Sequence, residues 1–247
     1  MDIDVALVPD QARQWRRTVC VVIDEIRASS TITVLLDLGC TSLYLTAGLQ
    51  HARRLARETG SLLAGERHGL TPRGFDFNNS PSELSRAGIR GRSVVLCTMN
   101  GTNVLSRLRH MPAALVGCIL NASASAEAAI DLAVTLDANL GVICAGQQGA
   151  FALDDAIAAG VIVDAMVDAL QIRGDRPCLT DAARAARRLR ASYPSVMAAF
   201  RDSDAWQVLH DIGAPEDLEL CARIDTTRTV GILRDGPALR IERLGGA

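Results

Sequence analysis

Short apolar runs of strand length alternate with stretches of helical periodicity through the first part of the chain, and this alternation constrains the fold more than any other feature. Helices are predicted between most of the runs, for example over Ala47–Glu58 and Ser123–Leu136. Alternation of this kind indicates βαβ units. We therefore expect an α/β fold with largely parallel sheets flanked by helices. The runs that predict strands are Val19–Ile23, Ser42–Thr46, Leu62–Ala64, Ser93–Cys97, Ala114–Leu120 and Leu140–Cys144.

The pattern changes in the C-terminal part of the chain. A long helix is predicted over Leu153–Ile172, and further helical segments follow it through Cys221. Two apolar runs, Thr229–Leu233 and Ala238–Arg243, then flank the sequence Arg234-Asp235-Gly236-Pro237. Because Asp-Gly between two apolar runs is a strong hairpin signal, we expect the chain to end in a β-hairpin.

The length of the chain sets the number of domains. Its 247 residues suit either one large α/β domain or two small ones that share a cleft. We interpret the pattern as an N-terminal α/β lobe over residues 1–115 and a C-terminal α/β lobe over residues 116–247. Because 49% of the residues are apolar and only 3% are aromatic, small aliphatic side chains must fill the core, as they do where helices cover a parallel sheet.

The net charge and the cysteines limit which cellular compartment and which classes of binding partner we expect. The formal net charge of −2 provides no field that would recruit nucleic acid, and the basic helical face formed by Arg184, Arg187, Arg188 and Arg190 is interpreted as a solvated surface. The seven cysteines include no C-x-x-C pair, which favours a reducing compartment. No signal peptide pattern and no apolar run of ~18 residues is present. We expect a cytoplasmic protein that binds neither nucleic acid nor membranes.

Polar side chains follow directly after the predicted strand Val19–Ile23. Asp24 lies just past the end of this strand, and Arg27 and Ser29 follow where the next helix begins. The exit of a strand in an open α/β sheet is the usual position of a site, and the N–H groups at a helix start bind phosphate or sulfonate. In the alternative interpretation, Ser29 only caps the helix and Arg27 pairs with Glu25.

A second polar segment follows Leu62–Ala64. It carries Glu66, Asp76 and Asn79, whose side-chain oxygens are ligands suited to Mg²⁺. Ser80 and Glu83 lie three residues apart in the same segment and form the signature of a capping box, so they have a purely structural explanation. Glu66 and Asp76 have no such explanation.

Two further strand exits have the same polar character. Thr98, Asn100 and Thr102 follow the strand that ends at Cys97, and they could bind a phosphate or simply form a tight turn and a helix cap. Asp154 and Asp155 open the helix after Leu140–Cys144, where acids either serve a site or complement the helix dipole. Strand ends converge in a parallel sheet, so four polar exits predict one site.

Several chemistries are excluded by missing motifs. The sequence contains no P-loop, no dinucleotide-binding G-x-G-x-x-G and no H-E-x-x-H zinc motif. A cysteine phosphatase would need an arginine where Ala150 stands, so Cys144 is interpreted as a packing residue. Asp24 lacks a second aspartate two residues later, where Ile26 stands, so the haloacid-dehalogenase pattern fails as well.

Taken together, these segments resemble the 2-phosphosulfolactate phosphatase family, the Mg²⁺-dependent enzymes of coenzyme M biosynthesis. The chain departs from the family's usual residues at Asn78, Met99, Asp154 and Gly231, where the family has Gly, Thr, Glu and Pro. The resemblance spans residues ~20 to ~160, with a weaker match in the tail at His210–Gly213, Asp217, Cys221 and Asp225. The segments that carry it are Val22–Thr31, Gly65–Arg67, Gly74–Asp76, Asn79–Glu83, Asn100–Thr102 and Cys144–Gly146 with Asp155.

The resemblance implies an active site in the cleft between two α/β lobes. It implies that Asp24, Glu66 and Asp76 hold Mg²⁺ and that Asp24, Arg27 and Asp155, or Asp154 in its place, are catalytic. The expected reaction is hydrolysis of 2-phosphosulfolactate to sulfolactate and phosphate. The residues expected to bind this small anionic substrate are Arg27, Ser29, Arg67, Asn79, Asn100, Gly101 and Thr102.

Two alternatives to this function stay open. One is a related phosphatase that acts on another small phosphorylated acid with the same residues. The other is a non-catalytic anion-binding relative, which would gain little from three carboxylates facing an anion. The sequence does not determine the oligomeric state, for which a homodimer is the general expectation.

Overall fold

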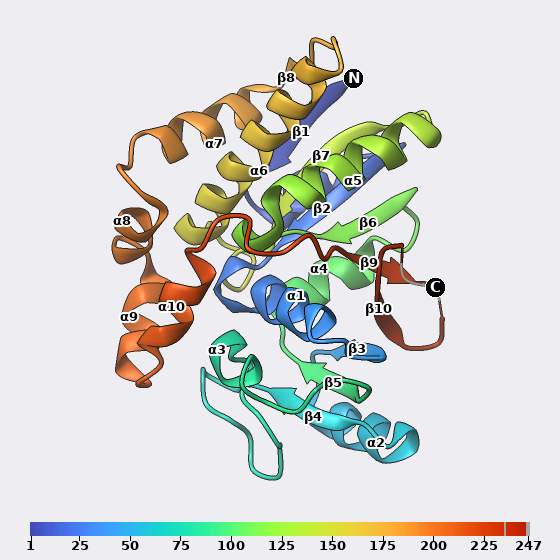
Figure 1. Cartoon of the computed structure of the whole chain (residues 1–247), viewed down its shortest axis with the longest axis vertical. Helices are drawn as coiled ribbons and strands as arrows, with labels where there is room; N and C mark the ends of the chain where they lie inside the picture. Colours follow the sequence, from blue (N-terminus) through green and yellow to red (C-terminus); the bar gives the residue numbers. More distant parts are fainter. Residues whose placement is uncertain (235, 246–247) are drawn as a thin grey trace.

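The computed structural model describes residues 1–234 and 236–245, and ten strands of these residues form one continuous sheet (Figure 1). The order of the strands across the sheet is β4-β5-β3-β10-β9-β6-β2-β7-β1-β8. Their bounds are β1 Asp2–Ala6, β2 Thr18–Ile23, β3 Ser42–Thr46, β4 Leu62–Gly65, β5 Ser93–Cys97, β6 Ala113–Val116, β7 Asn139–Cys144, β8 Cys178–Leu179, β9 Gly231–Arg234 and β10 Leu239–Arg243.

The sheet consists of two parallel groups that run in opposite directions. Strands β3, β4 and β5 are parallel to one another, and so are β1, β2, β6, β7 and β8. The C-terminal hairpin β9–β10 lies between the groups, with β10 antiparallel to β3 and β9 antiparallel to β6. The expected hairpin and the largely parallel sheet are therefore confirmed, although the hairpin occupies the middle of the sheet. Asp235 of the expected turn lies outside the described residues.

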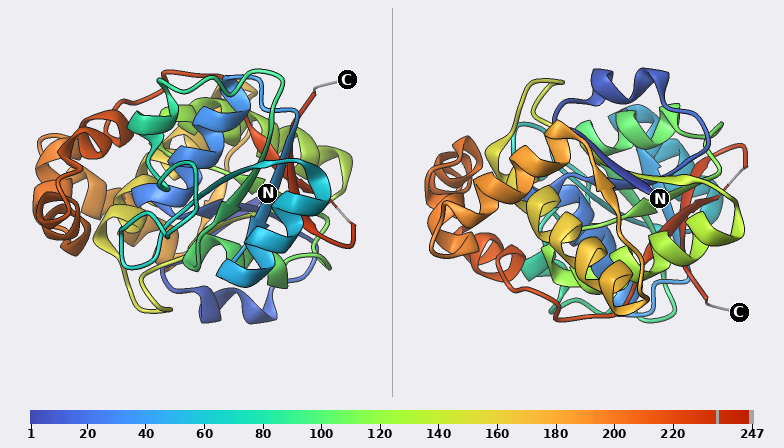
Figure 2. Two further views of the ribbon diagram at one scale, coloured as in Figure 1. Left: turned by 90° about the horizontal axis from the view of Figure 1, so that it is seen from below. Right: turned by 90° about the horizontal axis from the view of Figure 1, so that it is seen from above.

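Helices cover both faces of the sheet (Figures 1 and 2). On β2, Val19 and Val21 pack in the core cluster that contains α5 and α6, whereas Cys20 and Val22 pack in the cluster that contains α1 and α4. The short helices α8, α9 and α10 gather at one end of the molecule in all three views. The α-helices are α1 Ser30–Asp37, α2 Leu49–Thr59, α3 Pro81–Leu84, α4 Asn100–Arg107, α5 Ala122–Thr135, α6 Leu153–Ile172, α7 Asp181–Ala191, α8 Val196–Arg201, α9 Asp204–Asp211 and α10 Pro215–Cys221. The other helical turns are η1 Pro9–Gln14, η2 Glu25–Ser29 and η3 Ile119–Asn121.

The predicted apolar runs match the observed strands closely, with one clear correction. The run expected over Ala114–Leu120 is a strand only as far as Val116, because the chain turns there into η3. Gly117 lies at this turn, where an added Cβ would lie 2.3 Å from Cγ1 of Val21. Strand β1, Asp2–Ala6, was not predicted, since its short alternating pattern carries two aspartates. The sheet runs without a break past residue 115, and the division into two lobes stays a prediction.

Most cysteines of this chain serve as small packing residues. All seven cysteines are free, and five of them are buried. Burial raises the pKa of the Cys144 thiol, which disfavours the thiolate that a cysteine nucleophile needs. Cys144 therefore packs in the core.

Within the described residues, every helix is too short or too polar to cross a membrane.

Candidate active site

A cavity of about 360 Å³ lies where strands from both directional groups end. Strands β2 and β7 belong to one group and β4 and β5 to the other, and the residues that follow each of them reach this cavity. The predicted convergence of the four strand exits is thus observed. The polar side chains that line the cavity include those of Asp24, Arg27, Glu66, His68, Asn79, Thr98, Asn100, Gln147, Gln148, Asp154 and Asp155.

Asp24 is held at the cavity by backbone contacts on both sides. It precedes η2, and its Oδ2 accepts a hydrogen bond of 2.7 Å from the Gly101 N–H. Its own N–H donates to Ser29 Oγ at 2.9 Å. Ser29 is therefore a buried brace for the backbone of Asp24, and the Gly101 N–H, which we expected to bind substrate, binds Asp24 instead. An added Cβ at Gly101 would lie 3.1 Å from Cβ and Oδ2 of Asp24, which leaves little space for a side chain.

Asp155 connects two strand exits through both of its carboxylate oxygens. Oδ1 accepts a hydrogen bond of 2.7 Å from the Glu25 N–H after β2, and Oδ2 accepts one of 2.7 Å from the Gly146 N–H after β7. These bonds give Asp155 a positioning role at the exits. Its neighbour Asp154, also buried and lining the cavity, is the better candidate for the acid–base group that we expected at one of the two positions.

Burial shifts the acidity of the carboxyl groups around the cavity. Burial, together with the smaller effect of the negative charge of Glu66, raises the pKa of Asp24 to about 6, against the opposing effect of the Gly101 N–H. Burial, together with the smaller effect of the charge of Asp24, raises the pKa of Asp154 to about 7. The pKa values of Glu25 and Asp155 are also raised by burial. The cavity therefore contains carboxyl groups that exchange protons near neutral pH.

Removing the Asp154 carboxyl group should stabilise the metal-free protein at alkaline pH. The folded-state pKa of about 7 lies above the ~3.9 of an unfolded Asp, so the stability linked to this group is complete below pH ~4 and is lost as the pH rises through 7. We expect Asp154→Asn to melt above the wild type at pH 8, by at least ~2–4 °C, the shift that ~1 kcal/mol produces in a chain of this size. At pH 4 the two proteins should melt together. Melting curves in chelator at both pH values test this, and an equal difference at both would contradict it.

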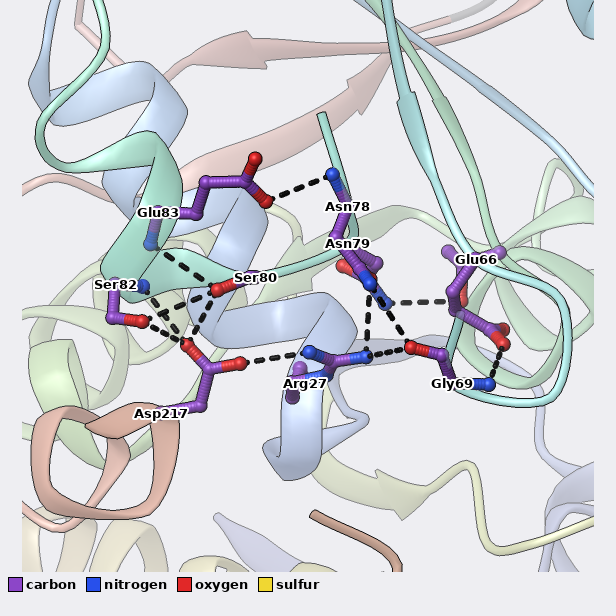
Figure 3. A network of polar contacts seen from close by, with 10 residues as sticks. Arg27, Glu66, Gly69, Asn78, Asn79, Ser80, Ser82, Glu83 and Asp217 are labelled. Atoms are coloured by element: carbon purple, nitrogen blue, oxygen red, sulfur yellow. Dashed lines mark hydrogen bonds and ion pairs between the residues drawn. The ribbon is translucent and has the colours of Figure 1, made fainter. Parts of the chain in front are cut away.

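Arg27 forms a buried ion pair with Asp217. Its Nη1 lies 2.7 Å from Asp217 Oδ2, and the two side chains are 4% and 0% exposed. Its Nη2 donates to Asn78 Oδ1 at 3.2 Å and to the Gly69 carbonyl at 3.4 Å (Figure 3). The alternative partner that the sequence suggested, Glu25, bonds to Ser30 and to the Ile119 N–H. The pairing of Arg27 with Glu25 is therefore not observed, and the guanidinium is fixed in a buried network at the cavity wall.

Asp217 also anchors the start of α3. Its Oδ1 accepts hydrogen bonds from the hydroxyls of Ser80 and Ser82 and from the Ser82 N–H, at 2.7, 2.6 and 3.0 Å (Figure 3). Ser80 caps α3 as predicted, by accepting from the Glu83 N–H at 3.1 Å. Glu83 departs from a standard capping box, because its carboxylate accepts from the N–H of Asn78, two residues before the N-cap residue Ser80. One buried carboxylate thus orients both Arg27 and the loop before α3.

Comparison with known proteins identifies the family. The model of the family described as 2-phosphosulpholactate phosphatase matches residues 6–236. The chain belongs to this family. It is 35% identical to a protein of Deinococcus radiodurans over the full length of both chains, and 33% identical to one of Thermus thermophilus over 98% of this chain and 100% of the relative. A protein of Clostridium acetobutylicum is 29% identical over 97% of this chain and 100% of its own. All three carry the name "probable 2-phosphosulfolactate phosphatase".

Apart from Ser29 and Gly101, three residues that the resemblance placed in the site of this family member also lie outside the cavity lining. Asp76 is exposed, and its Oδ2 accepts a hydrogen bond of 2.8 Å from the Leu63 N–H, which attaches the loop to β4. Arg67 is exposed, with Nη1 3.3 Å from the sulfur of Met99. Thr102 is buried within α4. Each lies within three positions of a cavity-lining residue in the sequence, but the backbone turns each side chain away.

Helix α9 forms a wall of the cavity that the sequence did not predict. Ala205, Val208 and Leu209 line the cavity from this helix, and the turn at Gly69 packs against the same helix near Ile212. His68 lines the cavity beside this turn with a left-handed backbone, φ 55°. The only sequence signal for this wall was the weak resemblance in the tail around His210–Gly213, because apolar residues of a surface helix carry no mark of what they face.

The Mg²⁺ that the resemblance implies can be tested against the donor set. Asp24, Glu66 and Asp154 supply hard oxygen ligands to one cavity, and their mutual repulsion is the kind that a bound cation relieves. The side chains fit a hard divalent cation in this respect. In residues 1–234 and 236–245, however, no three acidic, histidine or cysteine side chains are arranged to hold a metal by themselves. Asp76, the third expected ligand, lies outside the cavity lining and accepts from the Leu63 N–H.

Proposed function

We propose that this protein is a Mg²⁺-dependent phosphatase that hydrolyses 2-phosphosulfolactate to sulfolactate and phosphate, as a step of coenzyme M biosynthesis. The family and the names of the relatives support the substrate. The single observation that carries the reaction class is the pair of buried carboxyl groups, Asp24 and Asp154, facing one cavity beside the guanidinium of Arg27.

Arg27 binds the anionic substrate in this proposal. Asp217, Asn78 and the Gly69 carbonyl hold the guanidinium plane in one orientation, which suits a geometry-dependent grip on a phosphoryl or sulfonate group. Asn100 is at the cavity edge, where its Oδ1 accepts from the Gln148 N–H at 3.2 Å and joins the exits of β5 and β7. Arg27 and Asn100 would orient the substrate. Hydrogen bonds within the chain already hold both side chains in place.

Asp154 is the proposed general base. A group with a pKa of about 7 is divided between its two protonation states at neutral pH, which suits it to take a proton from the attacking water and to return it to the leaving hydroxyl oxygen of sulfolactate. Asp24 and Glu66 are the carboxylates that would hold Mg²⁺. When bound, this ion supplies charge neutralisation for the phosphoryl oxygens.

A phosphate-release assay with and without metal tests this function. We expect release from 2-phosphosulfolactate to stop after treatment with a chelator and to return when Mg²⁺ is added, because the cavity carboxylates otherwise repel the anionic substrate. A panel of other phosphorylated hydroxy acids covers the alternative of a different small substrate. Full activity in metal-free buffer would contradict the metal requirement, and binding of the panel compounds without any release would indicate an anion-binding relative.

A further inference from the structure

The loop between β4 and α3 brings to the cavity wall a residue other than the acid that the sequence singled out. The carboxylate of Asp76 accepts a hydrogen bond from the Leu63 N–H, and the residue lies outside the cavity lining. Three residues later, Asn79 lines the cavity and is 3% exposed. Its Nδ2 lies 3.5 Å from Thr98 Oγ1, at the limit of a hydrogen bond. Within the described residues, Asn79 Oδ1 is buried and has no hydrogen-bond partner.

A buried amide oxygen without a partner is uncommon in folded proteins and calls for an explanation. The backbone on either side of Asn79 is strongly fixed, so loose packing does not explain it. The Asn78 N–H donates to Glu83 Oε2 at 2.9 Å, and the Ser80 hydroxyl donates to Asp217 Oδ1 at 2.7 Å (Figure 3). The chain therefore holds Asn79 between two anchored neighbours, while its buried carbonyl oxygen has no hydrogen-bond partner among the described residues.

We propose that Asn79 Oδ1 completes a divalent-cation site with the carboxylates of Asp24 and Glu66. This inference rests on the proposed function, because the cation is the one the phosphatase reaction would use. All three side chains line the same cavity and offer the oxygen ligands that Mg²⁺ prefers. The cation would then be the missing partner of Asn79 Oδ1. The third ligand would be this amide rather than the carboxylate of Asp76.

Charge balance favours an amide at this position. Two carboxylates and one amide carry a total charge of −2, which a divalent cation neutralises, whereas three carboxylates would leave the site negative. The substrate carries several negative charges, so a neutral loaded site repels it less than a negative one would. Asn79 thereby supplies a ligand without adding to the negative charge already provided by Asp154 in the same cavity.

The opposite orientation of the same amide makes a different prediction. If the amide oxygen and nitrogen of Asn79 were exchanged, Oδ1 would accept a hydrogen bond from the Thr98 hydroxyl. The NH₂ group would then be directed into the cavity, where it could donate to the substrate's anion. Asn79→Asp separates the two arrangements, because aspartate has nearly the same shape and can only accept. A cation site keeps its ligand and gains charge, whereas an anion site loses its donor and repels the ligand.

The test is a calorimetric titration of the full chain with MgCl₂ in the absence of substrate. We expect Asn79→Ser to weaken Mg²⁺ binding by at least ~10-fold, the lower limit for disturbing groups around a metal. Asn79→Asp should bind as tightly as the wild type or more tightly. Asp76→Asn is the matched control from the same loop, and its affinity should stay within about twofold of the wild type, since its carboxylate lies outside the cavity.

The result that would overturn the proposal is equally direct. It is wrong if Asn79→Ser binds Mg²⁺ as the wild type does, if Asn79→Asp loses binding, or if the wild type does not bind Mg²⁺. Should Asn79→Ser fail to fold, the isosteric Asn79→Asp decides alone. Failure of the proposed function is distinguishable: the wild type would then bind Mg²⁺ in an Asn79-dependent manner and release no phosphate from any compound of the panel.

Discussion

Replacing Asp24 with asparagine should lower the phosphatase turnover by about 10²-fold or more while the protein stays folded. Disturbing groups around a metal ligand commonly costs ~10–100-fold, and Asp24 is proposed as a ligand itself. The amide can still accept the Gly101 N–H, so the contact between η2 and α4 survives. Because burial raises the pKa of the Asp24 carboxyl to about 6, removing its charge should also raise the melting temperature of the metal-free protein at pH 8.

The controls for Asp24 separate the lost charge from general damage. Asp2 is an exposed aspartate on β1, and Asp2→Asn should leave both turnover and melting temperature unchanged. Turnover with Mg²⁺ and the affinity for Mg²⁺ should be measured on both variants. If Asp24→Asn retains near-normal turnover with normal metal affinity, Asp24 is structural and the assignment of the strand exit as the reactive position is wrong.

Replacing Asp217 with asparagine should destabilise the protein by about 3–5 kcal/mol, the usual cost of leaving one member of a buried ion pair without its partner. The pair with Arg27 is 4% and 0% exposed, so water cannot compensate the guanidinium. In a chain of this size each 1 kcal/mol lowers the melting temperature by about 2–4 °C. Activity should fall as well, because Asp217 orients Arg27 and the start of α3. Asp217 itself does not line the cavity, so this effect on activity is indirect.

The neighbouring residue supplies the control. Glu216 pairs with Arg86 at 2.7 Å, but both side chains are more than half exposed, so Glu216→Gln should cost no more than about 1 kcal/mol. Arg27→Lys keeps the charge beside Asp217 and removes the planar fork, so its activity should fall by about 10- to 100-fold if the fork binds the substrate's anion. Urea unfolding curves and kcat/KM of the three variants decide this. Similar stabilities of Asp217→Asn and Glu216→Gln would exclude a buried ion pair.

The roles within the site show why residue type and position do not suffice. Asp154 and Asp155 are adjacent acids at the start of one helix, and nothing in their sequence distinguishes them. Asp155 binds two backbone N–H groups from different strand exits, one of them after β2. That contact joins residues 130 positions apart, and only the folded structure shows that Asp155 forms it.

The apolar pattern of the sequence was sufficient for most of the strands, although not for β1 or for the end of β6, and for the expectation that the polar strand exits meet. Burying strand-length runs such as Val19–Ile23 requires the carboxylates that follow them to lie at the sheet edge, so the four polar exits predict one site. The family resemblance on those exits was confirmed by the comparisons. These conclusions depend on local pattern, which is written in consecutive residues.

Only the tertiary structure decided how the exits meet and which side chains turn inward. The sheet joins two strand groups of opposite direction through the C-terminal hairpin, and no local pattern encodes a pairing between β10 and β3. The partner of Arg27 is Asp217, and their pairing joins distant parts of the chain because both side chains are removed from water together. In the loop before α3, backbone hydrogen bonds direct Asp76 outward and Asn79 inward. Side-chain direction depends on where the backbone N–H groups of other segments lie, and folding alone brings those groups into place.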